Sequence, residues 1–126
     1  MVAMTNYLEN KLLDHALGTT AYTAPTNVYV KLHIGDPGED ATGFPAVEAT
    51  RKVTGSFAAA AAGTTDNDAL IEWLSVSTTE VYSHISIWDA ATLGNPLFYG
   101  ALTSTVSMTA GDDFQLPAAS LALTFD

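Results

Sequence analysis

The chain has 126 residues, a length that predicts one domain with a hydrophobic core of its own. Fourteen acidic residues outnumber four basic ones, and the formal net charge of -10 argues against a nucleic-acid partner because phosphate backbones would be repelled. The absence of cysteine excludes a disulfide framework, a cysteine-ligated zinc site and a cysteine nucleophile. No apolar run reaches the roughly 18 residues of a membrane span, and residues 1–10 lack the pattern of a signal peptide.

The first predicted element is a helix over residues 5–17. Thr5 is a suitable N-cap, since its hydroxyl can accept a hydrogen bond from a free backbone N–H of the first turn. Gly18 ends the helix because glycine enters the left-handed region at little cost. Apolar residues recur at helical spacing on one stripe: Leu8, Leu12, Leu13, Ala16 and Leu17. A helix this short is marginal alone, so we expect its stripe to pack on the chain's own sheet or on a neighbouring subunit.

The rest of the chain, from about residue 27 to 125, predicts short strands separated by turns. Residues 28–34 alternate between apolar and polar positions, and residues 35–38 form a turn rich in glycine and proline. Further strands are expected over 47–53, 55–62, 70–76, 81–88, 97–102, 106–109 and 121–125, with residues 63–68 as a polar turn. About eight strands with no helix between them predict a mainly β fold. We expect an antiparallel β-sandwich or jelly-roll-like single domain over residues 1–126, with one short N-terminal α-helix.

Side chains suited to catalysis or metal binding do not form a recognisable set. His15, His33 and His84 fall on three separate elements without the close spacing of a metal site. Two acidic turns, around residues 36–40 and 66–68, carry carboxylates of the kind that can bind calcium, but neither matches an EF-hand. Aspartate and asparagine are also common in turns because they bond their own backbone, which explains the same residues. Serine-nucleophile and nucleotide-binding motifs are absent. We therefore expect a non-enzymatic protein with no catalytic residue, no cofactor and no metal.

Aromatic side chains give the strongest indication of an interaction surface. Tyr29, Trp88 and Tyr99 fall on strand faces opposite the expected core positions, and aromatic residues on an outer face are enriched where proteins meet. The alternative is that the strand phase is wrong and these rings are core. With Leu8 and Leu12 of the helix, they are the predicted interface residues.

Several segments resemble a family of short virion proteins of tailed phages that are commonly labelled tail-fibre proteins. The most recognisable segment is 84–92, with the sequence HISIWDAAT, and the resemblance runs on through 94–102, with the sequence GNPLFYGAL. The other matching segments are 5–10 and 12–15, 22–25, 28–30 with Leu32, 36–38, 42–43, 110–112 and 121–126. The chain departs from the family over residues 56–63, where it has a run of alanines instead of a bulkier, more polar strand.

The resemblance implies a structural component of a tailed-phage virion, assembled in the cytoplasm of the bacterial host. We expect a capsid decoration or cement protein that stabilises the head, because the chain has no repeat, heptad or shaft pattern that would give a fibre its length. The alternative is a tail-fibre or fibre-base component involved in attachment to a host glycan or receptor. A small cell-wall hydrolase is a third, weaker hypothesis. Expected partners are further copies of the chain, with a trimer favoured, and other virion proteins such as the major capsid protein, without nucleic acid or membrane.

Overall fold

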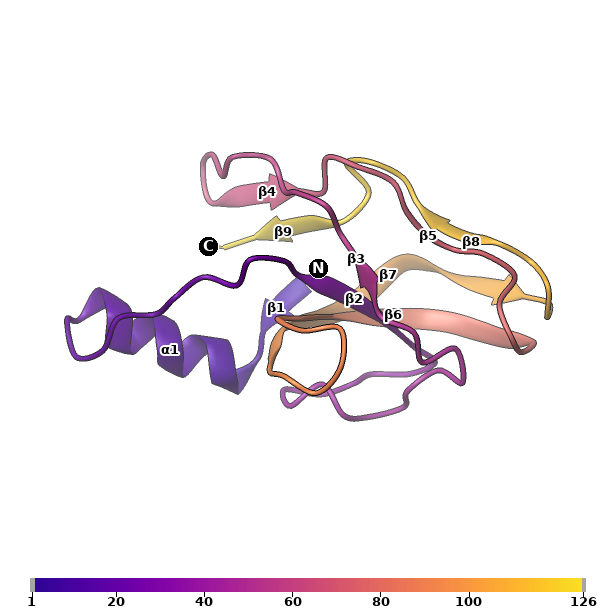
Figure 1. Cartoon of the computed structure of the whole chain (residues 1–126), viewed down its shortest axis with the longest axis horizontal. Coiled ribbons are helices and arrows are strands. Elements are labelled where there is room, and N and C mark those ends of the chain that lie inside the picture. Colours follow the sequence, from indigo (N-terminus) through magenta and orange to yellow (C-terminus); the bar gives the residue numbers. More distant parts are fainter. Residues whose placement is uncertain (1, 126) are drawn as a thin grey trace.

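The computed structural model describes residues 2–125, so Met1 and Asp126 of the predicted domain lie outside the described residues. It confirms a mainly β fold with one short helix near the N-terminus (Figure 1). The elements in chain order are β1 (Val2–Met4), α1 (Asn6–Ala16), β2 (Tyr29–His33), β3 (Lys52–Val53), β4 (Thr64–Asp66), β5 (Ile71–Trp73), β6 (Glu80–Trp88), β7 (Pro96–Met108), β8 (Phe114–Leu116) and β9 (Ala122–Thr124).

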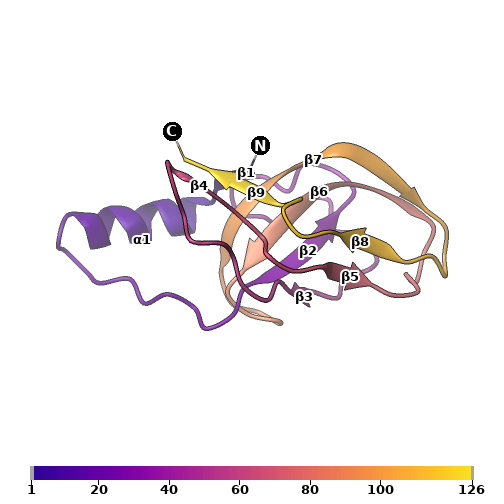
Figure 2. The same cartoon turned by 90° about the horizontal axis from the view of Figure 1, so that it is seen from above.

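The strands form two layers. One layer is a five-stranded antiparallel sheet in the order β1-β7-β6-β2-β3. The other consists of two antiparallel ribbons, β4-β9 and β5-β8, which lie on the same side of the large sheet. Figure 2 shows the same ribbons from above, crossing over β6 and β7. The predicted sandwich therefore has one broad sheet and one layer divided into two ribbons.

The core lies between these layers. Val30 and Leu32 of β2 and Ile85 and Ile87 of β6 point from the large sheet toward the ribbons and are almost fully buried. Phe114 of β8 packs against two aromatic rings: its centroid lies 5.2 Å from that of Tyr82 in an edge-on arrangement and 5.6 Å from that of Trp73. Such pairs contribute about 1 kcal/mol beyond the burial of their area.

The strand boundaries differ from the sequence prediction in several places. Residues 64–66, predicted as a polar turn, form β4 because their backbone pairs with β9. Only the last two residues of the predicted strand 47–53 are in a strand, and residues 55–62 contribute isolated bridges at Phe57 and Ala61. The predicted strands 97–102 and 106–109 are one strand, β7, while β1 and β8 were not predicted.

Helix α1 is anchored at its first turn and projects from the body (Figures 1 and 2). The Thr5 hydroxyl accepts from the Leu8 N–H, as predicted for an N-cap, and donates to the Pro96 carbonyl at 2.6 Å. Leu8 is the one helix residue that is fully buried, whereas Leu13 is 59% exposed and the C-cap Leu17 is 78% exposed. Most of the apolar stripe therefore stays open along residues 12–17. Within residues 2–125, no helix is long and apolar enough to cross a membrane.

Candidate functional site

The face of the five-stranded sheet that points away from the ribbons carries most of the predicted interface aromatics. Tyr29 lies directly opposite Trp88 in the β2–β6 pairing, and Tyr99 lies opposite Ser86 in the β6–β7 pairing. Their neighbours in each strand point into the core, so the alternation places all three rings on this outer face. Two chain segments, residues 34–46 and 89–95, lie over the same face (Figure 1).

Trp88 is only 8% exposed, so it is not the open surface residue that the sequence suggested. The Arg51 guanidinium lies 3.8 Å from the centre of its ring, and the Lys31 ammonium lies 5.7 Å from it. Arg51 also donates to the carbonyls of Ala90 and Leu93, which ties the 89–95 turn to the sheet. Burial and the neighbouring Arg51 lower the pKa of Lys31 from its usual value.

The other predicted interface residues differ in their exposure. Leu8 is buried under the first turn of α1, where it packs within the chain itself. Leu12, Tyr29 and Tyr99 are half-buried and keep part of their surface open. An interface role for these residues stays a prediction. Leu8 and Trp88 could act in an interface only indirectly, by holding exposed neighbours in place.

A chain of buried polar groups crosses the outer face beneath Trp88. The Nδ1 atom of His33 lies 2.8 Å from the Gly43 carbonyl, its Nε2 atom lies 2.7 Å from Ser86 Oγ, and Trp88 Nε1 donates to Ser86 Oγ at 2.7 Å. Because a carbonyl only accepts, Nδ1 carries the proton and Nε2 accepts from the Ser86 hydroxyl. Burial lowers the pKa of His33, which keeps the ring neutral as this arrangement requires.

The Ser86–His33 pair has the spacing of a nucleophile and its base, yet it is placed unsuitably for catalysis. Both residues are fully buried, so no substrate atom reaches the Ser86 oxygen. That oxygen already accepts from the Trp88 indole, and it donates its proton to His33. The pair therefore fixes the orientation of Trp88 and His33 inside the fold.

The remaining histidines and the acidic turns have local structural partners. His15 Nδ1 accepts from the Tyr22 backbone N–H at 3.0 Å, and Ser83 Oγ lies 2.8 Å from His84 Nδ1. Asp40 accepts from both the N–H and the hydroxyl of Thr42, and these bonds hold the pKa of its carboxyl below the usual value. Across residues 2–125, no group of three or more histidine, aspartate or glutamate side chains is gathered to hold a metal ion.

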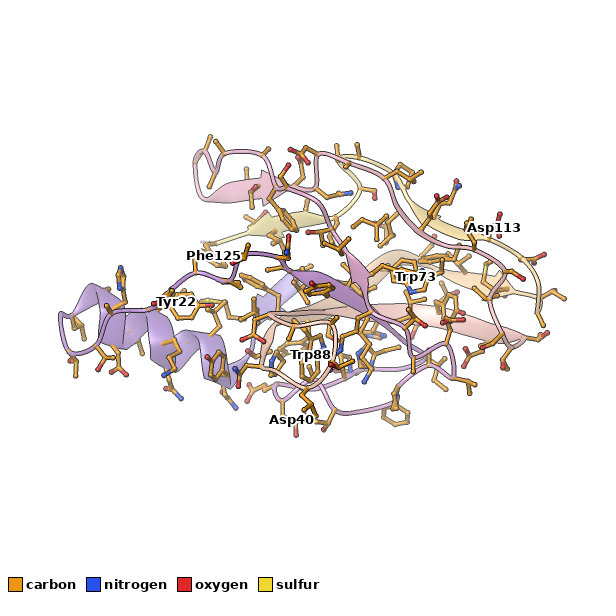
Figure 3. All side chains as sticks on the ribbon, in the orientation of Figure 1. Tyr22, Asp40, Trp73, Trp88, Asp113 and Phe125 are labelled. Atoms are coloured by element: carbon orange, nitrogen blue, oxygen red, sulfur yellow. The ribbon has the colours of Figure 1, made fainter. Side chains whose placement is uncertain are left out.

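An open cleft of about 530 Å³ lies where α1, the returning segment 22–27 and the turn after β6 meet. We call it the tyrosine cleft. Its walls include Tyr7 from α1, Tyr22 from the returning segment, Tyr29 from β2 and Asp89 from the turn. Figure 3 places Tyr22 on the segment that runs back along the helix. Tyr29 was predicted from its place on a strand, whereas Tyr7 and Tyr22 were not, because no motif links residues from a helix, a coil and a strand.

Beside the core, a second, almost purely apolar groove of about 290 Å³ opens between the large sheet and the β4-β9 ribbon. Phe98 and Phe125 form part of its wall and stack with their ring centres 5.9 Å apart. Phe125 is labelled at this end of the molecule in Figure 3. Apolar surface of this kind is common where protein subunits meet.

Comparison with known proteins gives one family. The family model described as podophage GP4 fiber I protein gp80 matches residues 3–124. The match spans the helix, both layers of the fold and every residue of the tyrosine cleft. A search of curated proteins found no match to the chain.

Proposed function

This chain belongs to the family of the podophage GP4 fiber I protein gp80, and from that premise we propose that it is a non-catalytic structural component of a fibre on a tailed-phage particle. The observation that carries the proposal is the family match over residues 3–124. The family makes the chain a virion component with a structural role. The buried, fully occupied Ser86–His33 pair supports the non-catalytic part of the proposal.

The family favours the fibre alternative over the capsid decoration role that was expected from the sequence. That preference rested on the lack of any repeat or shaft pattern, which argues only that this domain is not itself a long shaft. A globular domain can serve as the base, joint or tip of a fibre whose length comes from other chains. Assembly in the host cytoplasm is part of the same proposal.

The location can be tested by separating heads from tails of purified particles and quantifying this chain in each by mass spectrometry. A fibre component should be present in a few copies per particle, in the tail or collar fraction. Gold-labelled antibody against the chain should decorate the same region in electron micrographs. Hundreds of copies on heads, with tails that lack the chain, would contradict the fibre role and restore the decoration hypothesis.

We further propose that the chain self-associates, with a trimer favoured, through the apolar stripe of α1. The support is the projecting helix with Leu13 and Leu17 open to solvent, together with the low share of charged residues, 14%. Light scattering of the double variant Leu13→Ser/Leu17→Ser should give a lower mass than the unchanged chain. Leu93→Ser is the matched control, since Leu93 is an exposed leucine in the 89–95 turn. An unchanged chain that is monomeric at all concentrations and on the particle would contradict self-association.

A further inference from the structure

We propose that the tyrosine cleft is a carbohydrate-binding site that takes one uncharged sugar ring of a glycan chain. This inference rests on the proposed fibre role and deepens it, because it assigns a ligand class to one defined site of the domain. The inference rests on three features of the cleft: its aromatic walls, its unpaired polar groups and its single charged side chain.

The aromatic walls come from three separate elements and enclose the same space. Tyr7, Tyr22 and Tyr29 are each half-buried, so every ring keeps an open part toward the cleft. Tyr7 and Asp89 line the same cleft as Tyr22, and burial together with their proximity raises the pKa of Tyr22. The apolar C–H faces of a pyranose ring pack on such aromatic surfaces while its hydroxyls point outward.

The polar groups of the cleft have few partners in the protein. Among the hydrogen bonds between residues 2–125, none is made by the phenol hydroxyls of the three tyrosines or by the side chains of Thr23, Thr26 and Asn27. These groups include both donors and acceptors at one place on the surface. A ligand that carries many hydroxyl groups can pair with both kinds at once.

Two contacts hold this arrangement in position before a ligand arrives. The Asp89 carboxylate accepts from the backbone N–H of Asn95 at 2.7 Å and from its side-chain amide at 3.0 Å, which closes the 89–95 turn. The Tyr22 N–H donates to His15 Nδ1, which fixes the returning segment against the helix. A site that is already ordered binds with a smaller entropy cost.

The charge of the cleft selects among ligand classes. Asp89 is the one charged side chain among its lining residues, so the lining itself offers no cation to pair with an acidic sugar or a phosphate. A proline-rich peptide would also suit tyrosine walls, but it offers mainly carbonyl acceptors and would leave the Asn27 side-chain carbonyl without a donor. An uncharged sugar satisfies both requirements.

The test is a heteronuclear NMR titration of the full chain with separate probes. The probes are the methyl glycosides of glucose, galactose, rhamnose and N-acetylglucosamine, with methyl glucuronide and a polyproline peptide as competing classes. At least one uncharged glycoside should cause saturable shifts at Tyr7, Tyr22 and Tyr29, with a dissociation constant of about 1 mM. A disaccharide of the same sugar should bind more tightly if the natural source is a polymer instead of a free sugar.

Variants decide whether the cleft carries the binding. Tyr22→Ala should weaken it about tenfold or more, which corresponds to about 1.4 kcal/mol. Tyr99→Ala should leave it unchanged, because Tyr99 lies on the same sheet face but outside the cleft. The proposal is overturned if no uncharged glycoside shifts the cleft at about 20 mM, if the glucuronide or the peptide binds better, or if Tyr22→Ala binds as the unchanged chain does. The particle location is measured independently, so this failure would leave the fibre role intact.

Discussion

Replacing Ser86 by alanine removes one hydroxyl that serves two buried neighbours. The Trp88 indole N–H donates to its oxygen at 2.7 Å, and its proton bonds to His33 Nε2, also at 2.7 Å. In Ser86→Ala both groups stay buried and lose their partner. Leaving one buried polar group unpaired costs about 1–3 kcal/mol, so the two together predict a loss of about 2–6 kcal/mol in the free energy of unfolding.

Urea unfolding followed by tryptophan fluorescence measures this loss directly. In a separate thermal melt the melting temperature should fall by about 10 °C or more, given the usual entropy of unfolding for a domain of this size. Ser104→Ala is the control, since Ser104 lies exposed on β7 and should change stability by less than about 0.5 kcal/mol.

A double-mutant cycle identifies which partner carries the effect. In a Trp88→Phe background the indole donor is already gone, so Ser86→Ala should cost less than it does in the unchanged chain. If Ser86→Ala unfolds with the same free energy as the Ser104→Ala control, the assigned hydrogen-bond chain is wrong.

Three further changes test other parts of the fold. Burial lowers the pKa of His33, so stability is complete above its unfolded pKa of about 6.5 and is lost as the pH falls through the lower folded value, by at most about 1.4 kcal/mol per pH unit. Urea unfolding at several pH values should show this slope, and an equal slope in His33→Gln would mean that another group causes the pH dependence. The Tyr82 hydroxyl is buried without a partner among residues 2–125, and burial raises its pKa to about 12. Tyr82→Phe should therefore hold stability or raise it by up to about 1 kcal/mol, and it should remove the late-ionising step from an ultraviolet titration; a loss above about 1 kcal/mol would reveal a missed partner. Gly63→Ala should cost about 1–3 kcal/mol more than Gly18→Ala, because both positions have positive φ but only at Gly63 would the new Cβ lie 2.5 Å from the Phe125 carbonyl oxygen. Equal thermal shifts for the two variants would refute the clash.

Local sequence signals predicted the helix and part of β2. Thr5 and Gly18 bound the helix as expected, because capping depends on residues next to each other in the chain. In β2 the alternation correctly places Val30 and Leu32 in the core, but it fails at the end of the strand. His33, expected outside, is fully buried, and Ile34, expected inside, is 46% exposed. The segment 34–46 covers the outer face of the sheet there, so a side chain that points to this face is not exposed to solvent.

Long-range partners explain most of the other differences. Residues 64–66 read as a turn because they are polar, and their strand exists only through pairing with β9 near the far end of the chain. The outer-face aromatics could be assigned by strand phase, whereas the burial of Trp88 depends on Arg51, which comes from a different part of the sequence. The tyrosine cleft could not be predicted from the sequence, since its three rings come from α1, the returning segment and β2 and lie together only in the folded chain.

The projecting helix extends from the body by way of one anchored turn. Its eleven residues extend about 16 Å from the anchored turn, and α1 contacts the body chiefly at β1 and β7. A tilt of about 10° at that anchor would move the far end by about 3 Å on the same helix dimensions. Because the Tyr22 N–H is bonded to His15, the returning segment would have to move with the helix. A neighbour that contacts Leu13 and Leu17 would therefore also act on the wall of the tyrosine cleft.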